Sequence, residues 1–401
     1  MKQQILIIGA GFGGMWSALS AVRLLDRHQR LDIAVTVLAP QAELRVRPRF
    51  YEADLATTVA PLGPLFDAVG VRFMQGCATR IDSAARRVSY RDASGNNAHL
   101  PYDRLILASG SQVSRPPVAG IDRFTFDVDS LESAQKLDAH LQSLRQQPDS
   151  PARNTVVVVG GGFTGIETAM EMPARLRAIL GEQTDIRVIV IDMAKQIGGA
   201  MGQEIATVVA QASDQLSLTW KLGSPVTQVE ADAVVLDNGE RIAASTVIWA
   251  VGVQASPLTQ QITGERDLHG RLHVDRNLKV LGQDAIYATG DTAYAAVDDA
   301  GNHALMTCQH AIALGRSAGN NAAADLLGVA PIPYSQPKYV TCLDLGAWGA
   351  VYTEGWERKV VLTGQEGKAL KTQINTEWIY PPAAERDTAL AAADPLIPVV
   401  A

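Results

Sequence analysis

Glycines occur twice in this 401-residue chain at the GxGxxG spacing that lets backbone turn tightly against a phosphate. The first set is Gly9, Gly11 and Gly14, which follows the apolar run of residues 5–8. A stretch with the periodicity of an amphipathic helix continues through Leu25, so the local pattern is strand, turn and helix. The free N–H groups and the dipole of such a helix start attract the charge of a pyrophosphate. The first turn therefore predicts a dinucleotide site.

The second set, Gly160, Gly162 and Gly165, follows a run of valines and again opens a helical stretch. A single GxGxxG motif is a weak signal, whereas two in this context predict two bound dinucleotides. The chain also repeats its plan beyond the turns, because TVIWAVG at 246–252 has the pattern of RLILASG at 104–110. This self-similarity predicts two nucleotide-binding units of one architecture.

The residue at the end of the second strand of each unit indicates which dinucleotide binds. In the second unit it is Asp192, whose carboxylate could accept hydrogen bonds from an adenosine ribose and would repel a 2′-phosphate. NADH is therefore favoured over NADPH. In the first unit the equivalent position is Ala39, which offers no side-chain acceptor. Gln41, Glu43, or backbone and water are the alternatives there.

Three arginines, Arg45, Arg47 and Arg49, occupy alternate positions after the second strand of the first unit. Extended backbone would place all three on one face. They are either a solvated basic edge or include one or two cations that reach cofactor phosphates or an acidic substrate. Arg49 is the favoured cofactor contact.

Charge and cysteine content exclude several classes of protein. The net charge is −7 and Lys and Arg form no block, which argues against a nucleic-acid partner. Cys77, Cys308 and Cys342 are far apart and form no CxxC motif, so neither a disulfide framework nor a dithiol pair is predicted. The sequence has no signal peptide and no apolar run of membrane-spanning length, and no metal site is expected. These features predict a cytoplasmic protein.

Changes in composition divide the chain into three regions. Residues 1–115 and 275–335 form the first unit, which is discontinuous because a late strand returns to nucleotide-type sequence. A polar linker leads to the second unit, residues 150–274. A Pro-rich joint then leads to residues 336–401, where two strands and one helix are predicted and the tail is expected to be loop.

The motifs together resemble the two-dinucleotide flavoprotein reductases of the pyridine nucleotide-disulfide oxidoreductase fold, and within them the type II NADH dehydrogenase and apoptosis-inducing-factor-like branch. The resemblance covers residues 1 to about 355 and is most specific in YATGDTA at 287–293. It implies a glutathione-reductase-like α/β fold with two Rossmann-like domains, the first for non-covalent FAD and the second for NADH, plus a small α+β C-terminal region. It also implies that Asp291 holds the flavin ribityl chain, that Gly290 permits close approach, and that Ala78 contacts adenine through its backbone.

The same resemblance extends to the helix that begins CQHAIALG, whose first turn abuts the flavin pyrimidine ring in the family. Gln309 matches the family's glutamine, and the helix start would stabilise an anionic reduced flavin by a few tenths to about 2 kcal/mol. Leu314 and Gly315 replace later glutamines and depart from the family's quinone-facing pattern. His310 either lies near the flavin carbonyl edge or serves only in packing. Glu167 faces the crevice between the two cofactors in relatives.

Cys308 stands where the family has alanine. A helix N-terminus favours the thiolate, so a lowered thiol pKa beside the flavin is one expectation for this residue. A redox pair would need a second cysteine within reach, and Cys77 and Cys342 lie elsewhere in the predicted fold. An inert, small hydrophobic role is therefore favoured for all three cysteines.

The candidate site residues fall into a catalytic set and a cofactor-binding set. The catalytic set is Glu167, Gln309 and His310. The cofactor-binding set is Gly9, Gly11, Phe12, Gly13, Gly14, Arg49, Ala78, Ser109, Gly110, Gly160, Gly162, Phe163, Thr164, Gly165, Asp192, Gly252, Gly290, Asp291 and Gln309.

The leading functional hypothesis is an enzyme in which NADH delivers a hydride to flavin N5 and the electrons pass to a quinone or another small aromatic oxidant. The C-terminal region would form the acceptor site. The first alternative is a reductase of ferredoxin or another redox protein, which would need a basic docking face such as residues 45–49. The second is a non-catalytic NADH-binding sensor, suggested by Ala39. The tail after Trp378 is poor in basic residues, so at most weak peripheral membrane contact is expected. The oligomeric state is open, with a homodimer as one option.

Overall fold

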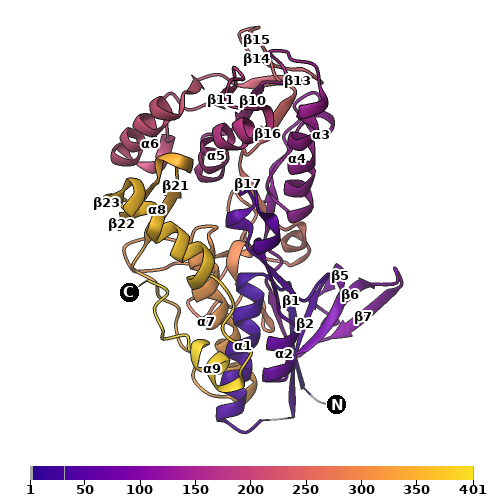
Figure 1. Cartoon of the computed structure of the whole chain (residues 1–401). Helices are drawn as coiled ribbons and strands as arrows, with labels where there is room; N and C mark the ends of the chain where they lie inside the picture. The colour runs from indigo at the N-terminus through magenta and orange to yellow at the C-terminus, as the bar shows by residue number, and fades with distance from the viewer. Residues whose placement is uncertain (1–2, 31, 401) are drawn as a thin grey trace.

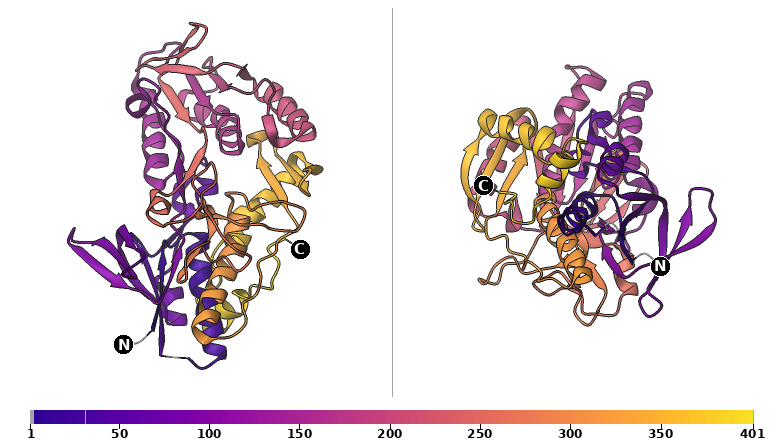
Figure 2. Two further views of the ribbon diagram at one scale, coloured as in Figure 1. Left: turned by 180° about the vertical axis from the view of Figure 1, so that it is seen from behind. Right: turned by 90° about the horizontal axis from the view of Figure 1, so that it is seen from below.

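Two sheets built around parallel strands, each covered by helices, form the two ends of the molecule, and a small antiparallel sheet lies beside both (Figure 1). The computed structural model describes residues 3–30 and 32–400, apart from the side chain of Ala200. Figure 2 shows the same arrangement from behind and from below. The structure confirms the predicted α/β class with two Rossmann-like units and an α+β C-terminal region.

The first unit combines N-terminal strands with elements from residues 272–327. Its elements are β1 (Gln3–Ile8), α1 (Phe12–Arg27), β2 (Ile33–Ala39), β3 (Glu43–Arg45), β4 (Val59–Pro61), α2 (Gly63–Val69), β5 (Arg72–Asp82), β6 (Arg87–Asp92), β7 (Asn97–Pro101), β8 (Arg104–Leu107), β18 (Leu272–His273), β19 (Ile286–Ala288), β20 (Ala293–Tyr294) and α7 (Cys308–Leu327). The main sheet has the order β19-β8-β1-β2-β5-β6-β7, with parallel pairs from β19 to β5 and antiparallel pairs in the projecting arm β5-β6-β7. Because β19 pairs with β8, a late segment completes the sheet that the N-terminal strands begin.

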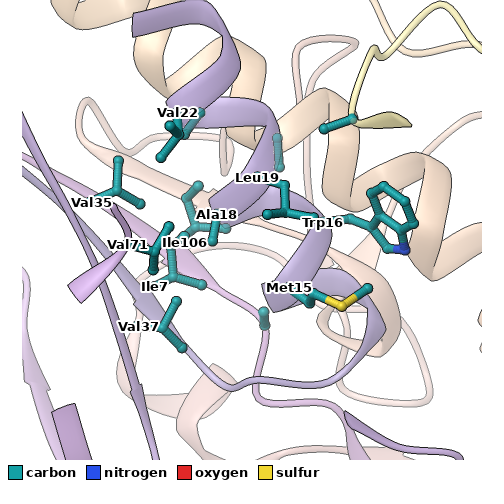
Figure 3. Close-up of a cluster of buried hydrophobic side chains, with 14 of the residues drawn as sticks. Ile7, Met15, Trp16, Ala18, Leu19, Val22, Val35, Val37, Val71 and Ile106 are labelled. Atoms are coloured by element: carbon teal, nitrogen blue, oxygen red, sulfur yellow. The ribbon is translucent and has the colours of Figure 1, made fainter. Parts of the chain in front are cut away.

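Helix α1 is held on this sheet by one apolar face. Met15, Leu19 and Val22 recur at helical spacing and belong to one buried cluster with sheet residues that include Ile7 and Ile106, all labelled in Figure 3. All five side chains are buried, and burial of each such side chain contributes about 1.5–3 kcal/mol. The core therefore fixes the start of α1 at the end of β1, where the first glycine turn lies.

The second unit repeats this plan with fewer strands. Its elements, with the segment that leads into it, are β9 (Ser111–Val113), α3 (Ile121–Phe124), α4 (Leu131–Ser143), β10 (Thr155–Val159), α5 (Phe163–Leu180), β11 (Arg187–Asp192), α6 (Gln203–Leu216), β12 (Leu218–Leu222), β13 (Val226–Val229), β14 (Ala233–Leu236), β15 (Arg241–Ala243), β16 (Thr246–Trp249) and β17 (Val253–Ala255). The parallel sheet has the order β12-β11-β10-β16, and β13-β14-β15 form a separate antiparallel sheet. Strands β9 and β17 pair antiparallel and join the two units.

The C-terminal region is a three-stranded antiparallel sheet followed by helices. Its elements are β21 (Val340–Asp344), β22 (Ala350–Glu354), β23 (Lys359–Thr363), α8 (Gly364–Gln373), a short π-helix (Ile374–Trp378) and α9 (Arg386–Ala392). The expectation that the tail is loop is wrong for α9, which packs on α1 and α2. Buried Ala389 and Leu390 supply the apolar contacts that make this short helix stable.

The sequence predicts that the three arginines at alternate positions share one extended face. The structure shows that they do not. Strand β3 ends at Arg45, and Arg47 to Arg49 form a 3-10 turn with Pro48 inside it. Proline fixes φ and lacks the N–H that a strand would need, so the backbone leaves the extended conformation here. The three side chains consequently point to different partners.

Asp325 on α7 joins three elements of the first unit. Its Oδ2 accepts hydrogen bonds from Arg104 Nε at 2.7 Å, Lys279 Nζ at 2.9 Å and the Tyr287 hydroxyl at 2.9 Å. Burial opposes the charged form, but these donors outweigh it and hold the pKa of Asp325 well below its ordinary range. The carboxylate therefore stabilises the fold above the unfolded pKa near 4, and this contribution is lost as the pH falls through the lowered folded pKa.

Asp325→Asn is expected to lower the free energy of unfolding at pH 7 by about 1–2 kcal/mol, allowing for solvent screening of a partly exposed group. Urea titrations at pH 7 and pH 3.5 measure this loss, which should be smaller at the lower pH. Asp299→Asn is the matched control, because Asp299 pairs with Arg276 on the surface and is fully exposed. Equal losses in the two variants would contradict the role given to Asp325.

Candidate functional site

The first glycine turn leaves an open space beside its middle glycine. A Cβ on Gly9 would lie 2.3 Å from the Ala108 carbonyl oxygen, and one on Gly14 would lie 1.9 Å from the Gly9 carbonyl oxygen. A Cβ on Gly11 would meet no atom within 4 Å. The outer glycines are therefore required by the packing of the protein itself, whereas the middle one borders space that a ligand can enter.

The second turn has the same geometry. A Cβ on Gly160 would lie 2.8 Å from the Ala250 carbonyl oxygen, and one on Gly165 would lie 1.8 Å from the Gly160 carbonyl oxygen. Gly162, like its counterpart in the first turn, has open space on that side. Gly162 also caps α5 without a side-chain hydrogen bond, and the first turn of α5 has no acidic residue. Both turns are thus cradles with free N–H groups that suit a phosphate.

Unpartnered hydroxyl groups lie at the ends of the strands around the first turn. Ser109 Oγ and Thr289 Oγ1 are buried and have no hydrogen-bond partner among the described residues. Thr289 lies next to the turn, because its Cγ2 would be 3.2 Å from a Cβ on Gly13. A buried hydroxyl without a partner is costly, so these groups fit a site that a polar cofactor fills.

Asp291, predicted to hold the ribityl chain, lies beside an arginine. Its Oδ2 accepts a hydrogen bond from Ser111 Oγ at 2.6 Å, and Arg47 Nη1 donates to the same Ser111 hydroxyl at 2.7 Å. Arg47 Nη1 lies 3.8 Å from Asp291 Oδ2 and also pairs with Asp129. The structure therefore places Arg47, rather than Arg49, next to Asp291.

Arg49 is occupied by other partners. The residue is 6% exposed, and its guanidinium donates to Glu52 Oε2 at 2.7 Å, to Thr57 and to Tyr380. Burial opposes the charge less than the Glu52 hydrogen bonds favour it, so the pKa of Arg49 is raised. All three guanidinium nitrogens of Arg49 donate to protein groups, so the structure gives no support to the predicted cofactor contact. The Pro48 signal for a turn could have shown that Arg47 and Arg49 point differently.

Asp192 lies directly against the second glycine turn, as its position at the end of β11 predicted. Its Oδ2 accepts a hydrogen bond from the N–H of Gly161, and its Oδ1 accepts one from Ala194 N at 2.6 Å. Asp192 is half-buried, so part of the residue is accessible. Its role toward the ribose stays a prediction.

Other predicted contacts occupy the ends of equivalent strands. Gly110 and Gly252 have φ values of +68° and +64°, which only glycine adopts without strain. Each precedes one strand of the β9–β17 pair that joins the units. Ala78 lies farther out, opposite Tyr90 in the antiparallel part of the first sheet, and its adenine contact stays a prediction. Phe12 and Phe163 begin α1 and α5, and Thr164 follows in α5.

Glu167 forms a buried ion pair with a residue of the C-terminal region. Its Oε1 accepts hydrogen bonds from Lys371 Nζ at 2.7 Å and from Asp344 N at 3.1 Å. Lys371 Nζ also donates to the Cys342 carbonyl oxygen at 2.9 Å. Burial raises the pKa of Glu167 and the lysine opposes this, whereas Glu167 raises the pKa of Lys371 against the effect of its burial. The pair ties α5 to α8.

Lys371 is not among the site residues that the sequence predicts. It lies three residues after Lys368 on one face of a predicted helix, and that spacing was the available signal. Lys368 Nζ pairs with Asp344 Oδ1 at 2.6 Å, so both lysines face the same acidic cluster. No spacing rule connects residue 167 to residue 371, and only the tertiary structure brings them together.

The start of α7 places Gln309 and His310 toward the C-terminal sheet. Gln309 Nε2 donates to the Val340 carbonyl oxygen at 3.2 Å. Thr307 caps the helix and its hydroxyl also pairs with His310 Nδ1 at 2.9 Å. His310 is fully buried against Tyr339, and burial lowers its pKa to about 4, so the ring is neutral at pH 7. Its Nε2 has no partner in the part of the chain that the structure describes.

The expectation of a lowered thiol pKa at Cys308 is wrong. Burial raises the pKa of Cys308 and outweighs the helix N-terminus and Lys371. Burial likewise raises the pKa of Cys342 to about 11, and Cys77 is exposed in β5. All three cysteines are free thiols.

The described residues contain neither a metal-binding cluster nor a membrane-spanning helix. Within residues 3–30 and 32–400, no three His, Cys, Asp or Glu side chains group in a way that could hold a metal ion. Over the same described residues, no helix has the length and apolar character needed to cross a membrane.

Comparison with known proteins identifies a family and several similar chains. Residues 3–315 match the family of pyridine nucleotide-disulphide oxidoreductases. The NADH dehydrogenase-like protein Rv1812c of Mycobacterium tuberculosis is 44% identical over 401 residues, covering 98% of each chain. The demethylphylloquinone reductase NdbB of Synechocystis is 31% identical and covers 87% of this chain and 86% of its own. A solved structure of NDH2 from Plasmodium falciparum in complex with NADH superposes with a TM-score of 0.79, at 15% identity and 98% coverage of each chain.

The fold and the paired glycine cradles define a protein with two dinucleotide sites. The chain belongs to the pyridine nucleotide-disulphide oxidoreductase family. The resemblance to its NADH dehydrogenase branch, noted in the sequence, is confirmed.

Proposed function

We propose that this protein is an FAD-dependent oxidoreductase that takes electrons from NADH and delivers them to a quinone or a similar small aromatic oxidant. The observation that carries the proposal is the pair of glycine cradles, each with a middle glycine that borders open space. Relatives named as an NADH dehydrogenase-like protein and as a demethylphylloquinone reductase support the donor and the kind of acceptor. FAD, rather than another flavin, follows from a first cradle shaped for a dinucleotide.

The residues divide the work between the two cofactors. The first cradle, Ser109 and Thr289 would hold FAD, with Asp291 fixed by Ser111 and Arg47. When bound, FAD supplies the acceptance of a hydride and the onward transfer of electrons. The second cradle and Asp192 would bind NADH.

The C-terminal region would shape the acceptor side. The neutral ring of His310 and the anchored Gln309 amide place polar groups at the start of α7, where the helix dipole favours negative charge. The buried Glu167–Lys371 pair holds α8 of the C-terminal region against the second unit.

A reductase of ferredoxin is less well supported, because the predicted basic docking face is neutralised. Arg45 pairs with Glu132 at 2.7 Å, Arg47 pairs with Asp129, and Arg49 pairs with Glu52. An acidic partner protein would find these cations already engaged.

The sensor hypothesis would require that the first cradle stay empty. The cytoplasmic location and a homodimer stay predictions from the sequence.

Stopped-flow absorbance distinguishes these functions in one experiment. NADH should bleach the flavin of the purified protein, and a quinone such as menadione should restore its colour faster than ferredoxin or oxygen. Colourless protein from which boiling releases no FAD would favour the sensor. Reoxidation by ferredoxin alone would favour the protein reductase.

Asp192→Arg is expected to move the ratio of kcat/KM for NADPH over NADH toward NADPH by about ten- to a hundredfold, the worth of about 1–3 kcal/mol for a charge-assisted hydrogen bond. The carboxylate that repels a 2′-phosphate is replaced by a cation that attracts it. Steady-state kinetics with both nucleotides measure the shift.

Asp185→Arg is the matched control, because it makes the same change of charge at an exposed position of the second unit. The control should leave the ratio within about twofold of the wild-type value. Wild-type protein that uses both nucleotides equally well would show that Asp192 does not select NADH.

A further inference from the structure

The turn between β22 and β23 carries an arginine to the second glycine cradle. This turn spans residues 355–358 and connects two strands of the C-terminal sheet, which lies beside α5 and α6 (Figure 1). The strand that follows the turn, β23, is anchored on the second unit, because Val360 N donates a hydrogen bond to Glu204 Oε2 at 2.8 Å. Glu204 lies in the first turn of α6. The position of the turn relative to the second unit is therefore fixed by a contact between the two.

Arg358 lies close to two aromatic rings at this junction, and its side chain hydrogen-bonds to Tyr339. Its guanidinium carbon lies 5.7 Å from the ring centroid of Phe163 and 5.9 Å from that of Tyr339. Phe163 is the first residue of α5 and directly follows Gly162, the open glycine of the second cradle. The guanidinium is thus held beside the helix start that would receive a pyrophosphate.

The backbone of Arg358 has an uncommon conformation. Its φ is +54°, in the left-handed region that residues other than glycine, Asn and Asp seldom adopt. Its N–H donates to the Gly355 carbonyl oxygen at 3.0 Å and closes the turn. Tyr339, which stacks on Trp356 at 4.6 Å, packs behind the turn. The surrounding contacts therefore maintain a conformation that directs this side chain toward Phe163.

A guanidinium at this place has a specific chemical use. The fork of Arg donors matches two phosphate oxygens at once, and partial removal from water strengthens the pair. The NADH pyrophosphate carries two negative charges, and the first turn of α5 offers N–H groups but no cationic side chain. A cation from the C-terminal sheet would offset part of this charge.

We propose that Arg358 binds the pyrophosphate of NADH, so that the C-terminal sheet forms one wall of the NADH site. This inference rests on the proposed function, because it assumes that NADH occupies the second cradle. It assigns to the hairpin β22–β23 a part in donor binding, in addition to the acceptor side expected of the region. Arg358 is then a binding residue for the dinucleotide and not a group that takes part in hydride transfer.

Binding of ADP-ribose tests the proposal without catalysis, because this compound carries the pyrophosphate and lacks the nicotinamide. Calorimetric titration of flavin-loaded Arg358→Gln should give a Kd about ten- to a hundredfold weaker than wild type, as expected for a lost charge-assisted contact. Stopped-flow reduction by NADH should show the same weakening of Kd with an unchanged limiting rate. Reduction by 1-benzyl-1,4-dihydronicotinamide, which has no phosphate, should stay within about twofold of wild type, since the variant alters only the phosphate contact.

Lys359→Gln is the matched control, because Lys359 is the next residue, carries the same charge and is exposed. It should leave all three measurements unchanged. Arg358→Lys keeps the charge without the fork and should weaken ADP-ribose binding about three- to tenfold, which serves as the test if the glutamine variant does not fold.

Two outcomes would overturn the inference. The first is unchanged ADP-ribose binding in both Arg358 variants. The second is an equal loss with the phosphate-free donor, which would indicate a general disturbance of the site. Wild-type protein that neither binds ADP-ribose nor is reduced by NADH would instead overturn the proposed function.

Discussion

Gly11→Val is expected to yield folded protein without flavin. Gly162→Val is expected to yield folded protein that keeps flavin but binds NADH at least about a hundredfold more weakly, a loss of about 2.7 kcal/mol. Each glycine borders open space that the phosphate of its dinucleotide would fill. The backbone at both positions is extended, with φ of −69° and −78°, so valine is tolerated there. The added side chain thus removes the ligand space without straining the protein.

Absorbance at 450 nm relative to 280 nm measures the flavin content, and stopped-flow reduction measures NADH binding. Gly63→Val is the matched control, because Gly63 also begins a helix and a Cβ there meets no atom within 4 Å. It should retain both cofactors. Full flavin in Gly11→Val, or wild-type NADH binding in Gly162→Val, would show that these open spaces do not receive phosphates.

Lys371→Met is expected to lower the free energy of unfolding by about 3–5 kcal/mol at pH 8, because it leaves the buried Glu167 carboxylate without its cation. Both side chains of the pair are less than one-tenth exposed, so water cannot replace the lost partner. Urea titration followed by circular dichroism measures the loss. Glu167→Gln/Lys371→Met removes both charges and should regain most of it.

The stability of the same variant should depend on pH more steeply than that of the wild type. Burial raises the pKa of Glu167, and in Lys371→Met the lysine no longer opposes that rise. A carboxyl group with a raised folded pKa stabilises the fold when protonated, so this stability is present below the unfolded pKa and is lost as the pH rises through the folded one. The deficit of Lys371→Met should therefore be smaller at pH 5 than at pH 8. An equal deficit at both values would mean that Glu167 is not left charged and buried.

The exposed Lys359 provides a control for the loss of a positive charge from the C-terminal region. Lys359→Met should change the free energy of unfolding by less than about 0.5 kcal/mol, as is usual for an exposed substitution. A comparable loss in Lys359→Met and Lys371→Met would indicate that net charge, and not the buried pair, sets the stability.

The sequence by itself determined the parts of this protein that depend on local geometry. A glycine turn between a buried strand and a helix can be read directly, because its outer glycines are required within a few residues of each other. Asp192 was placed at the second turn by its position at a strand end, and the structure shows its carboxylate hydrogen-bonded to that turn. The late strand β19 was assigned to the first unit from its sequence pattern, and it pairs with β8.

Tertiary structure alone decided which side chains meet across long separations. Glu167 pairs with Lys371, and Phe163 contacts Arg358, because the C-terminal sheet packs beside α5. No periodicity in the sequence encodes this packing. Arg47, and not Arg49, lies beside Asp291 because residues 47–49 form a 3-10 turn. The pKa of Cys308 is raised because the thiol is buried. Local rules fix backbone turns over a few residues, whereas the free energy of a buried charge depends on every element packed around it.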